Sequence, residues 1–351
     1  MQLVTLRAIV RNALSELGWS DALDRSMRKS IKFNDEQLLG RIRRIDRGLS
    51  TFHCVHVGRM SEQQSFEEHR VRNLRSDVAV GDWIVVTADC ERIVGIVPPY
   101  SCLVRRAASD DDRATAQRIA ANLDVVFLVH ALDAPPNQRR LERELVLAFD
   151  SGARPVVVLT KSDGIDTVEA AAMRDTMAAI SLGVAVCVVS SVTGEGIDEL
   201  RRFVSDGVTA AVLGASGVGK STLVNALTGT SSQETGAVRR VDQRGRHTTA
   251  AVELIPLPEH GWLIDTPGLR AVGLWTSGHG IERAFADIFA LAEHCRFRDC
   301  KHEHEPGCAV LAAIADGTVD GTLDRARLES MRRLVAEEAA LERTQQRARR
   351  R

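Results

Sequence analysis

Residues 214–222 read GASGVGKST, and this stretch decides the fold. It fits the phosphate-loop pattern Gly-x-x-x-x-Gly-Lys-Ser, it follows an apolar run at residues 209–213, and it opens a helical stretch that continues to residue 227. A strand, a glycine-rich loop and a helix in this order form the context in which the motif binds nucleotide phosphates. The residues expected to contact the nucleotide here are Gly214, Ala215, Ser216, Gly217, Val218, Gly219, Lys220, Ser221 and Thr222.

The composition of this loop follows from its chemistry. Glycines let backbone N–H groups turn toward phosphate oxygens, and the helix N-terminus adds a favourable dipole. Lys220 supplies a positive charge, and Ser221 offers a hydroxyl to Mg²⁺. Taken alone, the loop predicts only that a nucleotide is bound.

The chain as a whole has the composition of a soluble globular protein. Its 351 residues suffice for two or three domains, with 44% hydrophobic and 26% charged residues. It lacks the run of roughly eighteen or more apolar residues that a membrane span needs, and residues 1–29 carry charges without a signal-peptide core. We therefore expect a cytoplasmic monomer with no membrane contact. The net charge of −1 leaves any nucleic-acid contact to local basic patches.

Residue patterns divide the chain into four segments. Residues 1–36 are polar and helical in pattern, with no chemistry to assign. Residues 37–104 hold short β-type runs between turn formers, which predicts an OB-type RNA-binding barrel of about five strands. Residues 105–272 alternate strand-like and helical stretches, which predicts an α/β domain with a parallel, doubly wound sheet. Residues 273–351 are helical, contain clustered cysteines and end in a basic tail.

The expected elements follow the apolar runs. Barrel strands are expected at residues 51–57, 71–73, 83–87 and 93–97. In the α/β domain, strands are expected at residues 125–129, 155–159, 184–189, 210–213, 251–255 and 262–264, and helices at 138–149, 168–180, 197–203 and 221–227.

Three further loops follow strands of this domain. Asp265-Thr266-Pro267-Gly268 comes after one strand, where Asp265 can reach Mg²⁺ through water and Gly268 can offer an N–H to a γ-phosphate. Thr160-Lys161-Ser162-Asp163 follows another, where Asp163 can accept hydrogen bonds from the guanine N1 and N2 groups and Lys161 can cover the base. Ser190-Ser191 follows a third, and Ser191 is the expected backbone donor to guanine O6.

Binding sites in open α/β sheets lie at the carboxyl ends of the strands, so these loops converge if the strands share one sheet. Guanine GTPases usually have Asn at the position of Thr160, which alters one polar contact. The alternative for residues 160–163 is a plain surface turn.

The order of these loops is unusual, because the base-reading loops precede the phosphate loop. An ordinary GTPase begins with the phosphate loop, and a circularly permuted one satisfies the same spatial arrangement. This order, the stretch Gly245-Arg246-His247-Thr248-Thr249 and the flanking segments resemble the bacterial ribosome small-subunit-dependent GTPase A family over residues 40–320. The resemblance implies a circularly permuted P-loop GTPase domain between an OB-type barrel and a helical zinc-binding domain.

The segment between the phosphate loop and Asp265 carries the expected catalytic residue. Hydrolysis needs a group that orients the attacking water, and Leu269 and Arg270 stand where Ras-like proteins have Gln. The resemblance implies that His247 takes this role, although a contact between His247 and RNA is the alternative. Thr248 or Thr249 should offer a hydroxyl to Mg²⁺, and the sequence does not decide which.

The cysteines separate into two kinds. Four are scattered in apolar segments, where buried free thiols are expected. Cys295, Cys300 and Cys308 instead cluster with histidines, and three thiolates with one imidazole complete a closed tetrahedral Zn²⁺ site of structural type. His294, His302 and His304 compete as the fourth ligand, and the resemblance favours His302.

Between residues 41 and 106 the chain carries eleven arginines and no lysine. Arginine suits bidentate phosphate contacts, and a solvated surface is the alternative. The resemblance implies a GTPase that binds the small (30S) ribosomal subunit and its rRNA, hydrolyses GTP to GDP late in maturation of that subunit, and is stimulated by it. Two rival functions are a phosphate-loop ATPase or small-molecule kinase, and a zinc-containing RNA-binding scaffold with a structural nucleotide.

Overall fold

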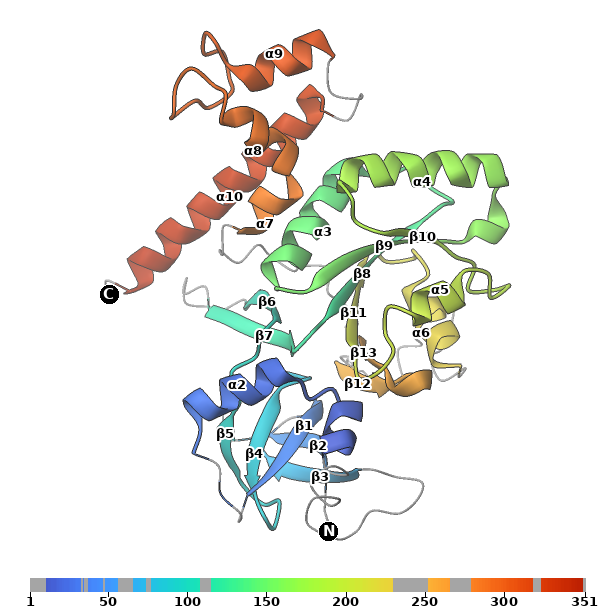
Figure 1. The fold of residues 1–351 in the computed structure, drawn as a ribbon, viewed down its shortest axis with the longest axis vertical. Helices are drawn as coiled ribbons and strands as arrows, with labels where there is room; N and C mark the ends of the chain where they lie inside the picture. Colours follow the sequence, from blue (N-terminus) through green and yellow to red (C-terminus); the bar gives the residue numbers. More distant parts are fainter. Residues whose placement is uncertain are drawn as a thin grey trace, which may run out of the picture.

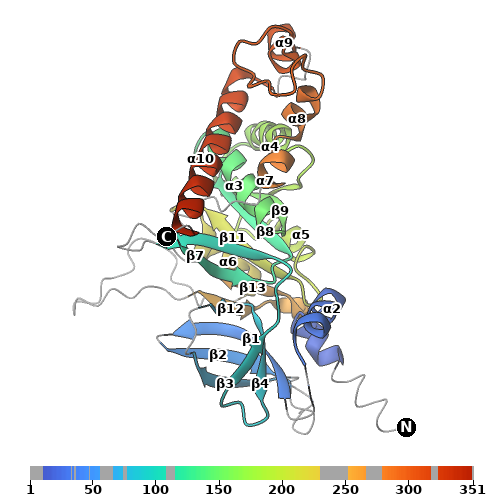
Figure 2. The ribbon, with the colours of Figure 1, turned by 90° about the vertical axis from the view of Figure 1, so that its left-hand side faces the viewer.

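The computed structural model describes residues 11–32, 34, 37–46, 48–55, 66–73, 77–107, 115–229, 252–265, 279–317 and 323–349. Within them, three parts follow one another along the long axis of the molecule (Figure 1). A strand-rich part lies at one end, an α/β sheet in the middle and a group of helices at the other end. The last helix runs back from this group along the middle part (Figure 2).

The strand-rich part has five strands in the antiparallel order β3-β2-β1-β4-β5. Their bounds are β1 Gln37–Asp46, β2 Leu49–Cys54, β3 Glu67–Arg72, β4 Trp83–Thr87 and β5 Ile93–Ile96. Ile42, Phe52 and Trp83 are completely shielded from solvent inside it. These strands agree with the expected OB-type barrel. The sequence pattern missed β1, because arginines interrupt its apolar residues.

The segment that precedes the barrel packs on it. Helix α2 (Asp21–Ser30) begins after Ser20, whose hydroxyl accepts a 3.4 Å hydrogen bond from the Leu23 N–H. Leu23 is completely buried, and the Trp19 ring meets the Trp83 ring edge-on at 4.8 Å between centroids. The helix expected in this segment thus contributes apolar side chains to the barrel core.

The middle part is one mixed sheet in the order β10-β9-β8-β11-β13-β12. Its strands are β8 Val125–Ala131, β9 Arg154–Thr160, β10 Val186–Val188, β11 Thr209–Gly214, β12 Glu253–Pro256 and β13 Trp262–Asp265. Side chains alternate between its faces: Val126 and Leu128 join the cluster under helices α3 (Gln138–Asp150) and α4 (Thr167–Ser181), whereas Phe127 joins the cluster under α5 (Ile197–Arg201) and α6 (Lys220–Thr228). The sheet is therefore doubly wound, as expected.

One strand departs from the expected parallel pattern. β12 pairs antiparallel with β13, because only residues 257–261 connect the two strands and a parallel connection needs a crossover of a dozen or more residues. β12 also pairs antiparallel with β1 through Arg44 and Glu253. The barrel and the middle part therefore share one continuous eleven-stranded sheet.

A β-hairpin and a group of C-terminal helices lie beside this sheet. The hairpin of β6 (Cys102–Ala107) and β7 (Thr115–Ala121) follows the barrel, and the expected boundary between residues 104 and 105 falls within β6. The C-terminal helices are α7 His279–Ala284, α8 Ala286–Ala292, α9 Ala309–Asp316 and α10 Arg325–Arg349. None of the helices in the described part of the chain is long and apolar enough to cross a membrane.

Candidate nucleotide site and metal centre

The predicted loops meet at one edge of the sheet. β9, β8, β11 and β13 are neighbours and parallel, and β10 is parallel to β9. The phosphate loop follows β11, Asp265 ends β13, residues 160–163 follow β9, and Ser190 and Ser191 follow β10. Four of the predicted site residues, His247, Thr248, Thr249 and Gly268, lie outside the described residues.

The phosphate loop joins β11 to α6 and ends at Gly219, the helix N-cap. Gly214 lies against β8, since a Cβ on it would come within 2.4 Å of the Val129 carbonyl oxygen. Lys220 Nζ donates a 2.9 Å hydrogen bond to the Gly214 carbonyl oxygen and another to that of Ala215. Ser221 is the second residue of α6, so the side chains predicted to bind phosphate and Mg²⁺ both start at the helix N-terminus.

Thr160 connects the base-reading loop to the phosphate loop. Its side chain is buried, and its hydroxyl lies 2.6 Å from the carbonyl oxygen of Val218 and 3.2 Å from that of His130. A hydroxyl can donate only one hydrogen bond, and the shorter distance indicates that Thr160 donates it to the carbonyl oxygen of Val218. The residue that replaces the usual Asn therefore fixes the phosphate loop relative to β9.

Ser190 connects the two base-reading loops. Its buried hydroxyl donates a 2.6 Å hydrogen bond to Asp163 Oδ1 and accepts hydrogen bonds from the N–H groups of Val192 and Thr193. The Asp163 carboxylate is exposed and oriented by this contact. Ser190 is thus engaged with the protein, while the Ser191 hydroxyl has no hydrogen-bond partner among the described residues.

Lys161 and Asp133 form an ion pair beside the phosphate loop. Lys161 has a left-handed backbone, with φ 64°, and its Nζ lies 2.6 Å from Asp133 Oδ2. Both residues line a cavity of about 370 Å³, whose walls include the loop before α3, Met173 and Met177 of α4, and residues 215–218. Sequence reasoning missed Asp133, although it follows β8 at the same edge of the sheet as every other predicted loop.

The predicted zinc ligands lie together next to α9. The ligand atoms of Cys295, Cys300, His302 and Cys308 all lie within 4.8 Å of one another. Cys295 Sγ is 3.9 Å from Cys308 Sγ, and His302 Nδ1 is 3.6 Å and 3.3 Å from those two sulfurs. Tetrahedral Zn²⁺ at its usual bond lengths separates two sulfurs by about 3.8 Å, and a sulfur from a nitrogen by about 3.5 Å. The three separations match those around one tetrahedral ion, and Cys300 lies close enough to the other three residues to supply the fourth ligand.

Local structure holds these ligands in place. His302 and Gly307 both have left-handed backbones, which turn the short loop back on itself. Cys308 is the N-cap of α9, and its sulfur accepts a 3.5 Å hydrogen bond from the Leu311 N–H. The group thus joins the loop to the start of a helix.

Comparisons with known proteins agree with this arrangement. The family model described as RsgA GTPase matches residues 96–275. A Streptomyces coelicolor protein named small ribosomal subunit biogenesis GTPase RsgA is 42% identical over 330 residues, which cover 93% of this chain and 87% of that protein. A Methanosarcina acetivorans protein of the same name is 41% identical over 262 residues, covering 74% and 69% of the two chains.

Two solved structures have a similar fold. YjeQ from Thermotoga maritima superposes with a TM-score of 0.61 at 22% identity, covering 86% of this chain and 99% of that one. YloQ, described as a circularly permuted GTPase, also gives a TM-score of 0.61 at 22% identity, covering 88% and 98%. These two likenesses concern the fold.

Proposed function

The chain belongs to the RsgA GTPase family, and on that premise we propose that it hydrolyses GTP to GDP and phosphate on the small ribosomal subunit, during maturation of that subunit. The observation that best supports nucleotide binding is the hydrogen bond from the Thr160 hydroxyl to the Val218 carbonyl oxygen. It holds the base-reading loop next to the phosphate loop. The subunit is named in the descriptions of the relatives.

In the proposed site each group has one task. Asp163, oriented by Ser190, accepts hydrogen bonds from the N1–H and N2–H groups of guanine, and adenine has no such donors at these positions. Lys220 exchanges its contacts with the loop carbonyls for phosphate oxygens when nucleotide enters. Ser221 and Asp265 would hold Mg²⁺, which would neutralise the negative charge that develops on the phosphates.

The remaining assignments fall on residues outside the described chain. We propose that His247 orients the attacking water, that Thr248 or Thr249 adds a hydroxyl to Mg²⁺, and that Gly268 offers its N–H to the γ-phosphate. The GTP-bound state would bind the subunit, and hydrolysis stimulated by the subunit would release the protein.

We further propose that the cysteine and histidine group holds one structural Zn²⁺. The closed set of four ligands leaves no position for a substrate or water, so the ion would support the fold of the C-terminal helices.

Among the described residues of the barrel, some arginine side chains are exposed and others are buried or paired. Arg41 is completely buried, and Arg43 is paired with Glu68 and Glu253. Arg70, Arg72 and Arg92 are exposed, and the last two line a groove of about 580 Å³ across β3, β4 and β5. We propose that these three side chains contact RNA phosphates, which arginine binds in a bidentate manner.

The experiment is a GTPase assay with and without purified small ribosomal subunits. We expect slow turnover by the protein alone, strong stimulation by subunits, and loss of both activities in Lys220→Ala. ATP should compete poorly with GTP; effective competition would favour the ATPase or kinase alternative. Undetectable hydrolysis with subunits present would favour the RNA-binding scaffold and refute the enzymatic proposal.

A further inference from the structure

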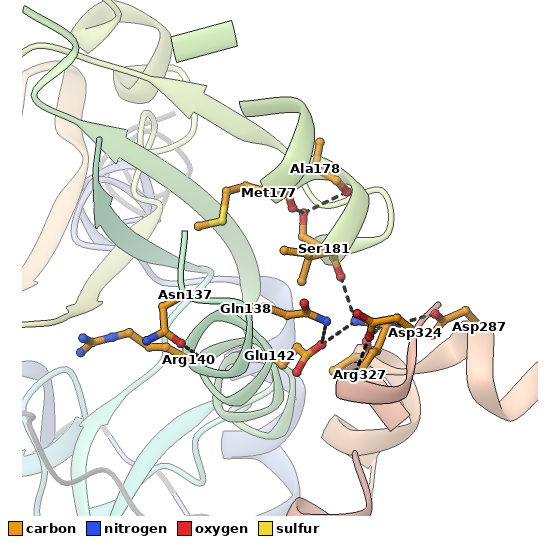
Figure 3. Close-up of polar contacts among 12 residues, drawn as sticks. Asn137, Gln138, Arg140, Glu142, Met177, Ala178, Ser181, Asp287, Asp324 and Arg327 are labelled. Carbon is orange, nitrogen blue, oxygen red and sulfur yellow. Dashed lines mark hydrogen bonds and ion pairs between the residues drawn. The ribbon is translucent and has the colours of Figure 1, made fainter. Parts of the chain in front are cut away.

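Arg327 of α10 is a fully buried arginine in the contact between the C-terminal helices and helices α3 and α4 of the middle part (Figure 3). Its guanidinium donates two hydrogen bonds to the carboxylate of Asp287, at 2.8 Å and 3.0 Å, and one of 2.9 Å to the Ala284 carbonyl. It also lies 4.9 Å from the centroid of the Phe285 ring. These contacts fix Arg327 within the C-terminal helices.

The remaining nitrogen of Arg327 binds two helices of the middle part. Nη1 lies 3.1 Å from Oε1 of Glu142, in α3, and 3.3 Å from the carbonyl oxygen of Ile180, in the last turn of α4. Glu142 is completely buried, and the same oxygen accepts a 2.9 Å hydrogen bond from Gln138. The positive charge of Arg327 also interacts favourably with the dipole of α4, because it lies at the C-terminus of that helix. One guanidinium therefore links the second turn of α3 to the last turn of α4.

The N-termini of these two helices lie at the nucleotide edge, so the contact at Glu142 is near that edge and the contact at Ile180 is at the far end of α4. α3 follows the loop that carries Asp133, and α4 follows the loop of Lys161 and Asp163. The 2.6 Å ion pair between Lys161 and Asp133 joins the two loops there. A helix of fifteen residues is a rod of about 22 Å, so a displacement of α4 against α3 at Arg327 changes the geometry of that pair.

We infer that Arg327 is a positioning residue for recognition of the guanine base. It holds the far end of α4 against the second turn of α3 and so keeps Lys161 and Asp163 in place at the near end of α4. The C-terminal helices thereby take part in nucleotide specificity without touching the nucleotide. This inference rests on the proposed function, because it takes Asp163 as the group that reads guanine.

A purely structural role for Arg327 would weaken binding of every nucleotide alike. A positioning role weakens the binding of GDP more than the binding of IDP. Inosine lacks the N2 amino group, so IDP cannot donate the hydrogen bond that the second carboxylate oxygen of Asp163 would accept from guanine. The measurement is the dissociation constant of each nucleotide, obtained by competition against a fluorescent GDP derivative with the full-length, metal-loaded protein.

The test variant is Arg327→Lys. It keeps the positive charge but loses the planar guanidinium, whose Nη1 contacts both α3 and α4 while its other two nitrogens contact the C-terminal helices. The matched control is Arg143→Lys, which alters another pair between α3 and α10, the bidentate contact of Arg143 with Glu337 at 2.7 Å. That pair is one-third exposed and is not bonded to α4. Melting temperature and metal content are measured for both.

We expect the preference of the wild type for GDP over IDP to fall by about fivefold in Arg327→Lys, which corresponds to the loss of one modest hydrogen bond, and to stay within about twofold in Arg143→Lys. An equal loss of GDP and IDP affinity, or no loss, overturns the inference. If Arg327→Lys does not fold, Glu142→Gln replaces it, and an unchanged preference there overturns the inference as well. A wild type that does not prefer GDP over IDP refutes guanine reading by Asp163, and the proposed function fails with it.

Discussion

The side-chain hydroxyl of Thr160 lies 2.6 Å from the main-chain carbonyl oxygen of Val218, across the gap between β9 and the phosphate loop. Guanine GTPases usually carry Asn at this position, and the threonine side chain here reaches the main chain of the phosphate loop. Threonine in place of the usual asparagine therefore still forms a hydrogen bond to the phosphate loop.

Thr160→Val should weaken GDP binding by about tenfold, because it leaves the Val218 carbonyl without its donor in a partly buried place. Thr160→Ser keeps the hydroxyl and should stay within about threefold of the wild type. Titration calorimetry with GDP measures both. Equal affinities for the valine and serine variants would show that this hydrogen bond does not support the site.

Ser190→Ala should lower the discrimination between GTP and ATP. The change removes the donor to Asp163 Oδ1 and the acceptor for the Val192 and Thr193 N–H groups, so the carboxylate loses its fixed orientation. We expect GDP affinity to fall by about tenfold, as for one charge-assisted hydrogen bond, with little change for ADP. The reference variant is Ser191→Ala, since no hydrogen-bond partner for the Ser191 hydroxyl is found in the described part of the chain. An equal effect of the two changes would contradict the role of Ser190.

The convergence of these loops could be predicted because each follows an apolar strand. The runs at 155–159, 210–213 and 262–264 identify the strands, and parallel strands bring their carboxyl ends to one edge. The spacing of Cys295, Cys300 and Cys308 likewise identified a group that the fold brings together. In these cases the chemistry is local to a short motif.

The contacts between distant segments could not be predicted in the same way. The charge of Arg327 suggests an exposed residue, and its burial depends on Glu142 and Asp287, far away in the chain. The antiparallel pairing of β1 with β12 depends on the barrel meeting the sheet, and no local pattern in residues 37–46 or 253–256 encodes it. Asp133 was missed because a lone acidic residue after a strand is common.

Removal of the metal should destabilise the C-terminal helices. Cys308→Ser replaces a ligand that is also the N-cap of α9, so we expect loss of bound zinc and a melting temperature lower by several degrees. Cys102→Ser changes a half-buried thiol outside the group and should keep a full equivalent of zinc. Metal analysis by mass spectrometry and calorimetric melting test this. A zinc content near zero in gently purified wild type would refute the metal site.

The contact between the barrel and the sheet should make stability depend on pH through His53. Its ring stacks on Phe66 at 4.9 Å and meets Trp262 of β13 at 5.7 Å between centroids. Burial, reinforced by the positive charges of Arg43 and Arg41 and partly offset by Glu68, lowers the pKa of His53 to about 4. The folded state therefore holds the neutral ring, while the unfolded chain takes up a proton below its ordinary pKa of about 6.5.

Since the folded pKa is the lower one, the contribution of His53 is complete above pH 6.5 and is lost as the pH falls toward 4. Between pH 7 and pH 5 the wild type should lose about 2 kcal/mol of unfolding free energy through this group. His53→Gln cannot take up the proton, so its urea-unfolding free energy should fall less over the same interval, while other groups such as the buried Asp82 titrate alike in both proteins. Parallel pH profiles of the two proteins would show that His53 stays accessible to protons in the folded state, and the buried packing of its ring against Phe66 and Trp262 would then be wrong.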